Sequence, residues 1–124
     1  IKVKLPSQEV LQAAKRVSAM SEMTLPVVLT FDNDELSLSS QGDVKSSATD
    51  SVAIAYDEKV FQCKYNTEYF IDGLVHAEGD VYYSASYARS NQGNVVEAKK
   101  SPGIIVPVDE DKQGNFKYII MPLN

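Results

Sequence analysis

The sequence predicts an α+β fold, in which two helices cover one face of two joined antiparallel sheets. Short segments alternate apolar and polar residues, as half-buried strands do, whereas two other segments repeat apolar residues at helical spacing. These elements follow one another as a strand, a helix and three strands, and this order occurs twice. The length of 124 residues suits a single domain over residues 1–124.

The first unit opens with a strand over residues 1–5, in which apolar residues alternate with lysines. Pro6 ends this strand, and Ser7 can cap a helix that we expect from Gln8 to Met20. The apolar stripe of this helix is narrow and consists of Val10, Ala13, Ala14, Val17 and Met20. Its other side carries Gln8, Gln12, Lys15, Arg16 and Ala19.

Three strands should complete the first unit. Residues 25–31 and 35–40 read as a hairpin, because the cluster Asp32-Asn33-Asp34 between them favours a turn. In the returning strand we expect Leu36 and Leu38 to face inward. After a second turn at residues 41–43, the third strand lies within residues 44–56, most clearly at residues 51–56.

The second unit repeats this order. A strand over residues 60–65 turns Phe61, Cys63 and Tyr65 to one side, and Cys63 is expected to be a buried thiol. Asn66 can cap a helix that runs to about His76. The residues of this helix that we expect to face the sheet are Tyr69, Phe70, Gly73 and Leu74. After a turn in which Gly79 takes positive φ, strands are expected at residues 81–87, 104–108 and 116–121, with a long polar loop over residues 88–102 and a charged turn at residues 109–115.

Composition narrows the classes of function. A single cysteine excludes a disulfide framework within the chain, and the net charge of −5 argues against a uniformly basic nucleic-acid binder. The sequence has no phosphate loop, nucleophile elbow or metal-ligand spacing, so we expect a non-catalytic binding module without cofactor or metal. The apolar runs are too short to span a bilayer, and we expect a cytoplasmic protein. Because the chain begins with Ile1, we expect a fragment of a longer protein.

Two segments carry a resemblance to a known family. The C-terminal run Tyr118-Ile119-Ile120-Met121-Pro122-Leu123 resembles the end of the bacterial DNA polymerase III beta subunit, the sliding clamp. The segment Tyr65–Leu74 is similar to the aromatic-Asn-x-x-Tyr motif that enters the last helix of the third clamp domain. The resemblance spans essentially the whole chain and implies the C-terminal domain of a three-domain clamp.

Such clamps close head to tail into a ring around duplex DNA, with helices inside, and tether the polymerase without chemistry of their own. The resemblance implies a clamp loader as a further partner and a bacterial or phage-infected cell as the setting. By the same resemblance, the DNA-facing side of the first helix would carry Gln8, Gln12, Lys15 and Arg16. The subunit interface would include Ala19 and Met20. With so few cations, we expect weak DNA binding without sequence preference.

The resemblance also implies a peptide-binding groove for polymerase and other clients, whose motifs carry Gln, Leu and Phe. The residues carried over to this groove are Asn66, Tyr69, Ile104, Val106, Ile119, Ile120, Met121, Pro122 and Leu123. Tyr118 and Ile120 could equally face the core, and the tail could simply cover it. The alternatives are a structural interface domain, or an unrelated enzyme or small-ligand carrier in which Tyr82, Tyr83 and Tyr87 line a cleft.

Overall fold

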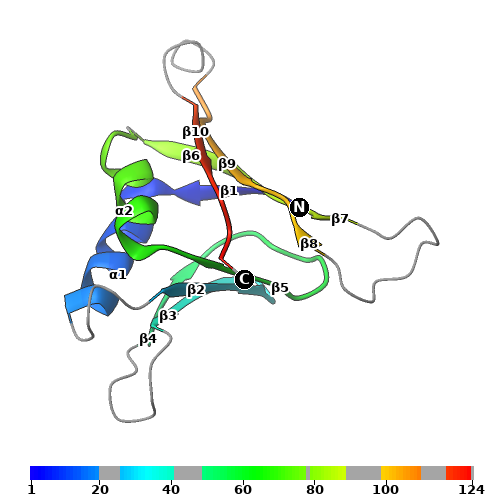
Figure 1. Cartoon of the computed structure of the whole chain (residues 1–124), viewed down its shortest axis with the longest axis horizontal. Coiled ribbons are helices and arrows are strands. Elements are labelled where there is room, and N and C mark those ends of the chain that lie inside the picture. The colour runs from blue at the N-terminus through cyan, green and yellow to red at the C-terminus, as the bar shows by residue number, and fades with distance from the viewer. Residues whose placement is uncertain (20–25, 41–48, 78, 89–98, 110–116, 124) are drawn as a thin grey trace.

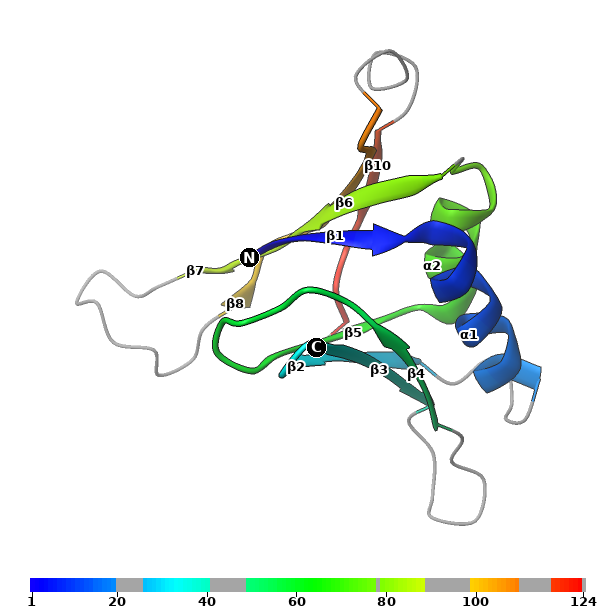
Figure 2. The same ribbon diagram turned by 180° about the vertical axis from the view of Figure 1, so that it is seen from behind.

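The computed structural model describes residues 1–19, 26–40, 49–77, 79–88, 99–109 and 117–123. Two four-stranded antiparallel sheets and two helices make up the fold, as predicted (Figure 1, Figure 2). Sheet A has the strand order β1-β6-β9-β10, and sheet B has the order β4-β3-β2-β5. The first strand of each unit therefore joins the sheet of the other unit, which ties both halves into one body.

The first unit agrees closely with its predicted pattern. In β1, Lys2–Pro6, the side chains of Val3 and Leu5 are buried and the two lysines are exposed. Helix α1, Ser7–Ala19, begins at Ser7 itself, whose hydroxyl donates a hydrogen bond to the Gly79 carbonyl. Its buried apolar face is wider than expected, because it includes Leu11 with Val10, Ala13, Ala14 and Val17. The expected stripe residue Met20 lies outside the described residues.

Strands β2, Val27–Asp32, and β3, Glu35–Ser40, form the expected hairpin, with Leu36 and Leu38 buried. Asn33 and Asp34 both take positive φ, 49° and 60°, as a tight two-residue hairpin turn requires. The turn expected at residues 41–43 lies outside the described residues.

The third strand of this unit is shorter than predicted. Strand β4, Thr49–Ala53, lies within the predicted residues 44–56, but it ends at Ala53, halfway through residues 51–56 where the strand was expected most clearly. The next residues bond to the hairpin turn, because the backbone N–H groups of Ile54 and Tyr56 donate to the carbonyl and the carboxylate of Asp34, respectively. Residues 54–56 therefore close around the turn instead of extending the sheet.

In the second unit, β5, Phe61–Tyr65, buries all three of its expected inward residues, Cys63 included. Helix α2, Thr67–Val75, begins after Asn66, whose side chain accepts a hydrogen bond from the Tyr69 N–H at 3.1 Å, and His76 follows its last turn. Phe70, Gly73 and Leu74 face the core as predicted. The prediction that Tyr69 faces the sheet is wrong: Tyr69 is 60% exposed, since the buried side of α2 is set by Phe70 and Leu74, four residues apart.

The remaining strands are β6, Asp80–Ser84, β9, Gly103–Pro107, and β10, Tyr118–Ile120, and Gly79 takes the expected positive φ of 72°. Strand β6 ends before residue 87 because the chain leaves β9 and forms a separate two-stranded ladder, β7, Tyr87–Ala88, with β8, Lys99–Lys100. Residues 89–98 of the expected loop, residues 110–115 of the charged turn and Phe116 lie outside the described residues, as does the Tyr87 side chain.

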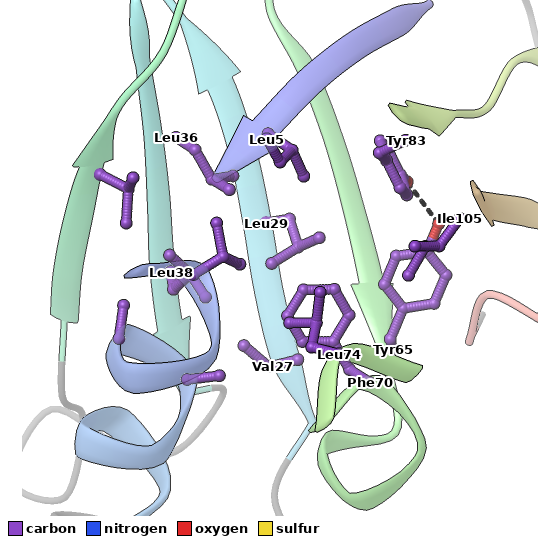
Figure 3. Close-up of a cluster of buried hydrophobic side chains, with 14 of the residues drawn as sticks. Leu5, Val27, Leu29, Leu36, Leu38, Tyr65, Phe70, Leu74, Tyr83 and Ile105 are labelled. Carbon is purple, nitrogen blue, oxygen red and sulfur yellow. Dashed lines mark hydrogen bonds between the residues drawn. The ribbon is translucent and has the colours of Figure 1, made fainter. Parts of the chain in front are cut away.

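The core fills the space between the two sheets and the helices. Tyr65 of sheet B and Tyr83 of sheet A point toward each other and share a hydrogen bond between their hydroxyls (Figure 3). Burial raises the pKa of Tyr65 far above its ordinary value. The ring of Tyr83 also stacks on that of Phe31, with 5.3 Å between their centroids. This buried aromatic contact fixes how the sheets meet, and it excludes Tyr83 from a ligand cleft.

Candidate apolar binding surface and helical face

The predicted groove residues of sheet A lie on its outer face. Ile119 of β10 is the cross-strand partner of Ile104 in β9, and both side chains point away from the core. Ile119 is 57% exposed, whereas Ile104 and Val106 are half-buried. Ile120 lies opposite Gly103 on the inner face and is only 2% exposed. The structure thus corrects the assignment of Ile120 to the groove, because alternation along β10 turns it into the core.

The C-terminal tail leaves β10 and crosses from sheet A to sheet B (Figure 1). The backbone N–H of Leu123 donates to the carbonyl of Lys64 in β5 at 2.8 Å. Met121 is 65% exposed and Leu123 is 39% exposed, while Pro122 between them is half-buried. The tail backbone is therefore tied to β5, while its apolar side chains Met121 and Leu123 are presented to solvent.

Helix α2 follows β5 directly in the chain, after Asn66. The Asn66 side chain is engaged as the helix cap, and the exposed Tyr69 lies in the first turn. From β10, the Tyr118 hydroxyl donates to the backbone carbonyl of Tyr69 at 2.8 Å. Partial burial raises the pKa of Tyr118, with smaller contributions from Asp72 and Tyr69. We call the exposed apolar residues of this region, namely Tyr69, Ile119, Met121 and Leu123, the tail surface.

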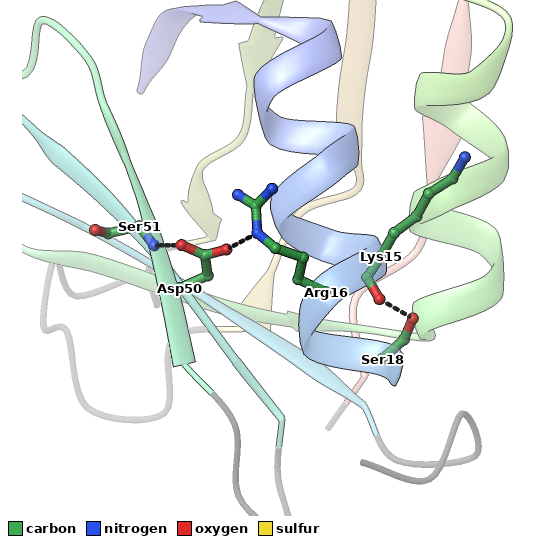
Figure 4. Close-up of polar contacts among 5 residues, drawn as sticks. All are labelled: Lys15, Arg16, Ser18, Asp50 and Ser51. Carbon is green, nitrogen blue, oxygen red and sulfur yellow. Dashed lines mark hydrogen bonds and ion pairs between the residues drawn. The ribbon is translucent and has the colours of Figure 1, made fainter. Parts of the chain in front are cut away.

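The four residues predicted to face DNA, Gln8, Gln12, Lys15 and Arg16, are all exposed on α1. The two cations point in different directions (Figure 4). Arg16 reaches β4, where its Nε donates to the Asp50 carboxylate at 2.5 Å, and Lys15 extends on the side of α2. This pairing holds the pKa of Asp50 below its ordinary value, first through the Arg16 hydrogen bond and then through the Ser51 N–H.

The helical face is consequently less basic than the sequence of α1 alone indicates. The exposed residues Glu68 and Asp72 add negative charge on α2. The positive charge of Arg16 is paired with the Asp50 carboxylate. Sequence reasoning missed Asp50, because the pair is separated by 34 residues and no local spacing signals it. Ala19, expected at a subunit interface, is exposed at the end of α1, and its companion Met20 lies outside the described residues.

The other polar clusters are explained by the fold. Asp32, Asp34 and Glu35 are exposed around the hairpin turn, and Asp34 is already bonded to Tyr56. Over the part of the chain that the structure describes, no group of three or more His, Cys, Asp or Glu side chains is arranged to hold a metal ion. None of the described helices is long and apolar enough to cross a membrane.

Residues 1–124 match the family model of the DNA polymerase III beta subunit, C-terminal domain. A curated relative, the beta sliding clamp homolog GriR of Streptomyces muensis, is 28% identical over 112 residues, which are 90% of this chain and 28% of that protein. The chain thus spans less than a third of the length of this relative.

Several solved sliding clamps have the same fold. A DNA polymerase III subunit beta from Bartonella birtlesii superposes with a TM-score of 0.77 at 22% identity, over 99% of this chain and 32% of that chain. A clamp from Pseudomonas aeruginosa bound to griselimycin gives a TM-score of 0.73 at 21% identity, over 99% and 30% of the two chains. With the match along its full length, this chain belongs to the family of C-terminal domains of the DNA polymerase III beta subunit.

Proposed function

We propose that this chain is the C-terminal domain of a three-domain sliding clamp, and that it binds short linear peptide motifs of replication and repair clients at the tail surface. One observation carries the peptide-binding proposal. Of the six large apolar side chains that are exposed among the described residues, four are Tyr69, Ile119, Met121 and Leu123. Exposed apolar residues that gather in one region mark interaction sites more often than scattered ones do.

The chemistry of the tail surface suits such a ligand. A tyrosine, two aliphatic residues and a methionine offer adaptable apolar contacts and no charge, as expected for a site that takes Leu and Phe side chains from several partners. Half-buried Ile104, Val106 and Pro122 would extend the contact area around these four residues. Sliding clamps of Pseudomonas aeruginosa and Bartonella birtlesii have been solved with griselimycin bound, which supports the presence of a ligand-binding surface in this family.

The wider role is that of a non-catalytic processivity factor. In the ring that we propose, each subunit has three domains, and the subunits assemble head to tail around duplex DNA. Ala19 and Met20 would lie at the subunit interface, and a clamp loader would open the ring. Gln8, Gln12, Lys15 and Arg16 would face the DNA backbone through contacts that do not depend on sequence. Because Arg16 is paired with Asp50, this domain would contribute only weakly. The setting would be the cytoplasm of a bacterial or phage-infected cell.

Thermal unfolding in the presence of candidate ligands tests the function directly. A peptide that carries Gln-Leu-x-Leu-Phe should raise the melting temperature of the chain, and above Kd the rise should grow with the logarithm of the peptide concentration, because the peptide binds only the folded state. A scrambled peptide, nucleotides and divalent cations should leave the melting temperature unchanged. Stabilisation by a nucleotide or a metal, without stabilisation by the peptide, would favour an unrelated ligand-binding domain and contradict the proposal.

A further inference from the structure

The tail surface is built from two separate parts of the fold. Ile119, Met121 and Leu123 belong to β10 and the tail, whereas Tyr69 belongs to the first turn of α2. One hydrogen bond joins these parts directly, from the Tyr118 hydroxyl to the Tyr69 carbonyl at 2.8 Å. A second, from the Leu123 N–H to the Lys64 carbonyl, also 2.8 Å long, ties the tail to β5, the strand that precedes α2. The relative position of the exposed side chains thus depends on contacts between β10, the tail and the chain around α2.

The contact of Tyr118 with α2 extends beyond its hydroxyl. A Cβ atom built on Gly73 would lie 2.5 Å from Cδ1 and 2.7 Å from Cε1 of Tyr118, so the ring rests directly on the bare helix backbone. Gly73 is one helical turn after Tyr69, which means that ring and hydroxyl hold the same turn. Glycine is unfavourable inside a helix, and this close approach gives a physical reason for it here.

We propose that Tyr118 is a positioning residue for peptide binding: through Gly73 and the Tyr69 carbonyl, it holds the Tyr69 side chain at a fixed place relative to Ile119 and Met121. This inference rests on the proposed function and deepens it. A surface whose parts are held in place before the peptide arrives loses less conformational freedom on binding, and therefore binds more tightly. Tyr118 itself is half-buried and faces inward from β10, so it would act through Tyr69.

The variant Tyr118→Phe isolates this effect, because it keeps the ring on Gly73 and removes only the hydroxyl. Calorimetric titration with the Gln-Leu-x-Leu-Phe peptide should show a Kd that is about 2–10-fold higher than that of the unaltered chain. The matched control is Tyr56→Phe, which removes a tyrosine hydroxyl bonded to the Lys59 carbonyl, away from the tail surface. We expect the control to lose a comparable amount of stability in urea and to keep the original Kd.

A double-mutant cycle separates positioning from general weakening. If Tyr118 acts through the Tyr69 side chain, Tyr118→Phe should cause no further loss of affinity in a Tyr69→Ala background. An equal loss in both backgrounds, or a Tyr118→Phe variant that binds as tightly as the unaltered chain, would overturn this inference and leave the proposed function intact. If the unaltered chain fails to bind the peptide at all, the proposed function is overturned and this inference with it.

Discussion

The backbone N–H of Leu123 donates a hydrogen bond to the carbonyl of Lys64, so the C-terminal tail of sheet A is tied to β5 of sheet B. Ile120, three residues earlier, is buried in the core, whereas Met121 is 65% exposed. The last described residues therefore divide into a strand that belongs to the core and a tail that lies on it. This division is what allows the tail to be removed or altered separately from the fold.

Deleting residues 121–124 should abolish binding of the Gln-Leu-x-Leu-Phe peptide and leave the domain folded. The core-facing residue Ile120 and the helix contact of Tyr118 remain, so the loss of stability should be limited mainly to one backbone hydrogen bond, about 0.5–1.5 kcal/mol. Peptide titration and melting curves on the same samples measure both effects. A deletion that unfolds the domain would show instead that the tail chiefly covers the core.

Truncating Tyr69 to Ala should weaken peptide binding at almost no cost in stability. Its side chain is 60% exposed, so removal opens no cavity, and the change in unfolding free energy should stay within about 0.5 kcal/mol. Phe70→Ala, one position along in α2, is the matched contrast, because Phe70 is fully buried and its truncation should cost about 3–5 kcal/mol. Urea unfolding of both variants distinguishes the exposed aromatic from the buried one. Equal losses for the two variants would contradict the orientation of α2.

Replacing Gly103 with Ala should destabilise the contact between the two sheets. A Cβ at this position would meet the Tyr65 hydroxyl, and it would also lie 3.1 Å from Cε2 of Tyr83. Overpacking of this kind typically costs about 1–3 kcal/mol. The midpoint of urea unfolding measures the loss, and near-ultraviolet circular dichroism reports on the tyrosine environment. An unchanged midpoint would mean that β9 does not approach Tyr65 this closely.

The ion pair between Arg16 and Asp50 should make stability depend on pH in a defined direction. The folded-state pKa of Asp50 is lowered, so the pair contributes fully above the ordinary value of 3.8 and is lost as the pH falls through the folded-state value. Urea unfolding of the unaltered chain and of Asp50→Asn should differ at pH 6, and the difference should shrink below about pH 4. A difference that grows toward low pH would contradict this sign.

The same variant should also strengthen binding to duplex DNA. Asp50→Asn releases Arg16 for phosphate contact, so binding at low salt should tighten and the slope of log K against log salt should steepen by up to about 0.9. Asp57→Asn is the matched control, since it changes the net charge equally from an exposed position outside the helices. Equal effects of the two variants in fluorescence anisotropy would reduce the result to net charge alone.

Local patterns predicted much of the fold. Alternation identified the buried faces of β1 and β5, and the Asn66 cap placed the start of α2 correctly. Alternation did not foresee that residues 54–56 bond to the Asp34 turn, because that competition depends on an element 22 residues away along the chain. The exposure of Tyr69 does not follow from the sequence, because an aromatic residue beside Phe70 in a helix fits the apolar face as well as the exposed one.

The candidate site could be predicted only in part. The family resemblance led to the exposed Ile119, Met121 and Leu123, but the choice between core and surface for Ile120 required the pairing of β10 with Gly103 in β9. The Arg16–Asp50 pair and the contact of Tyr118 with Gly73 join distant parts of the sequence, and neither follows from residue spacing.

Calorimetric titration of Met121→Ala with the Gln-Leu-x-Leu-Phe peptide tests the central claim most directly. Met121 is 65% exposed at the tail surface, and Val60, at 59%, offers a matched exposed apolar residue elsewhere, so neither truncation should destabilise the fold. We predict that Met121→Ala raises the peptide Kd at least about tenfold, as loss of a residue worth more than about 1.4 kcal/mol would. Val60→Ala should bind as the unaltered chain does. Equal affinity of Met121→Ala and the unaltered chain would contradict peptide binding at the tail surface.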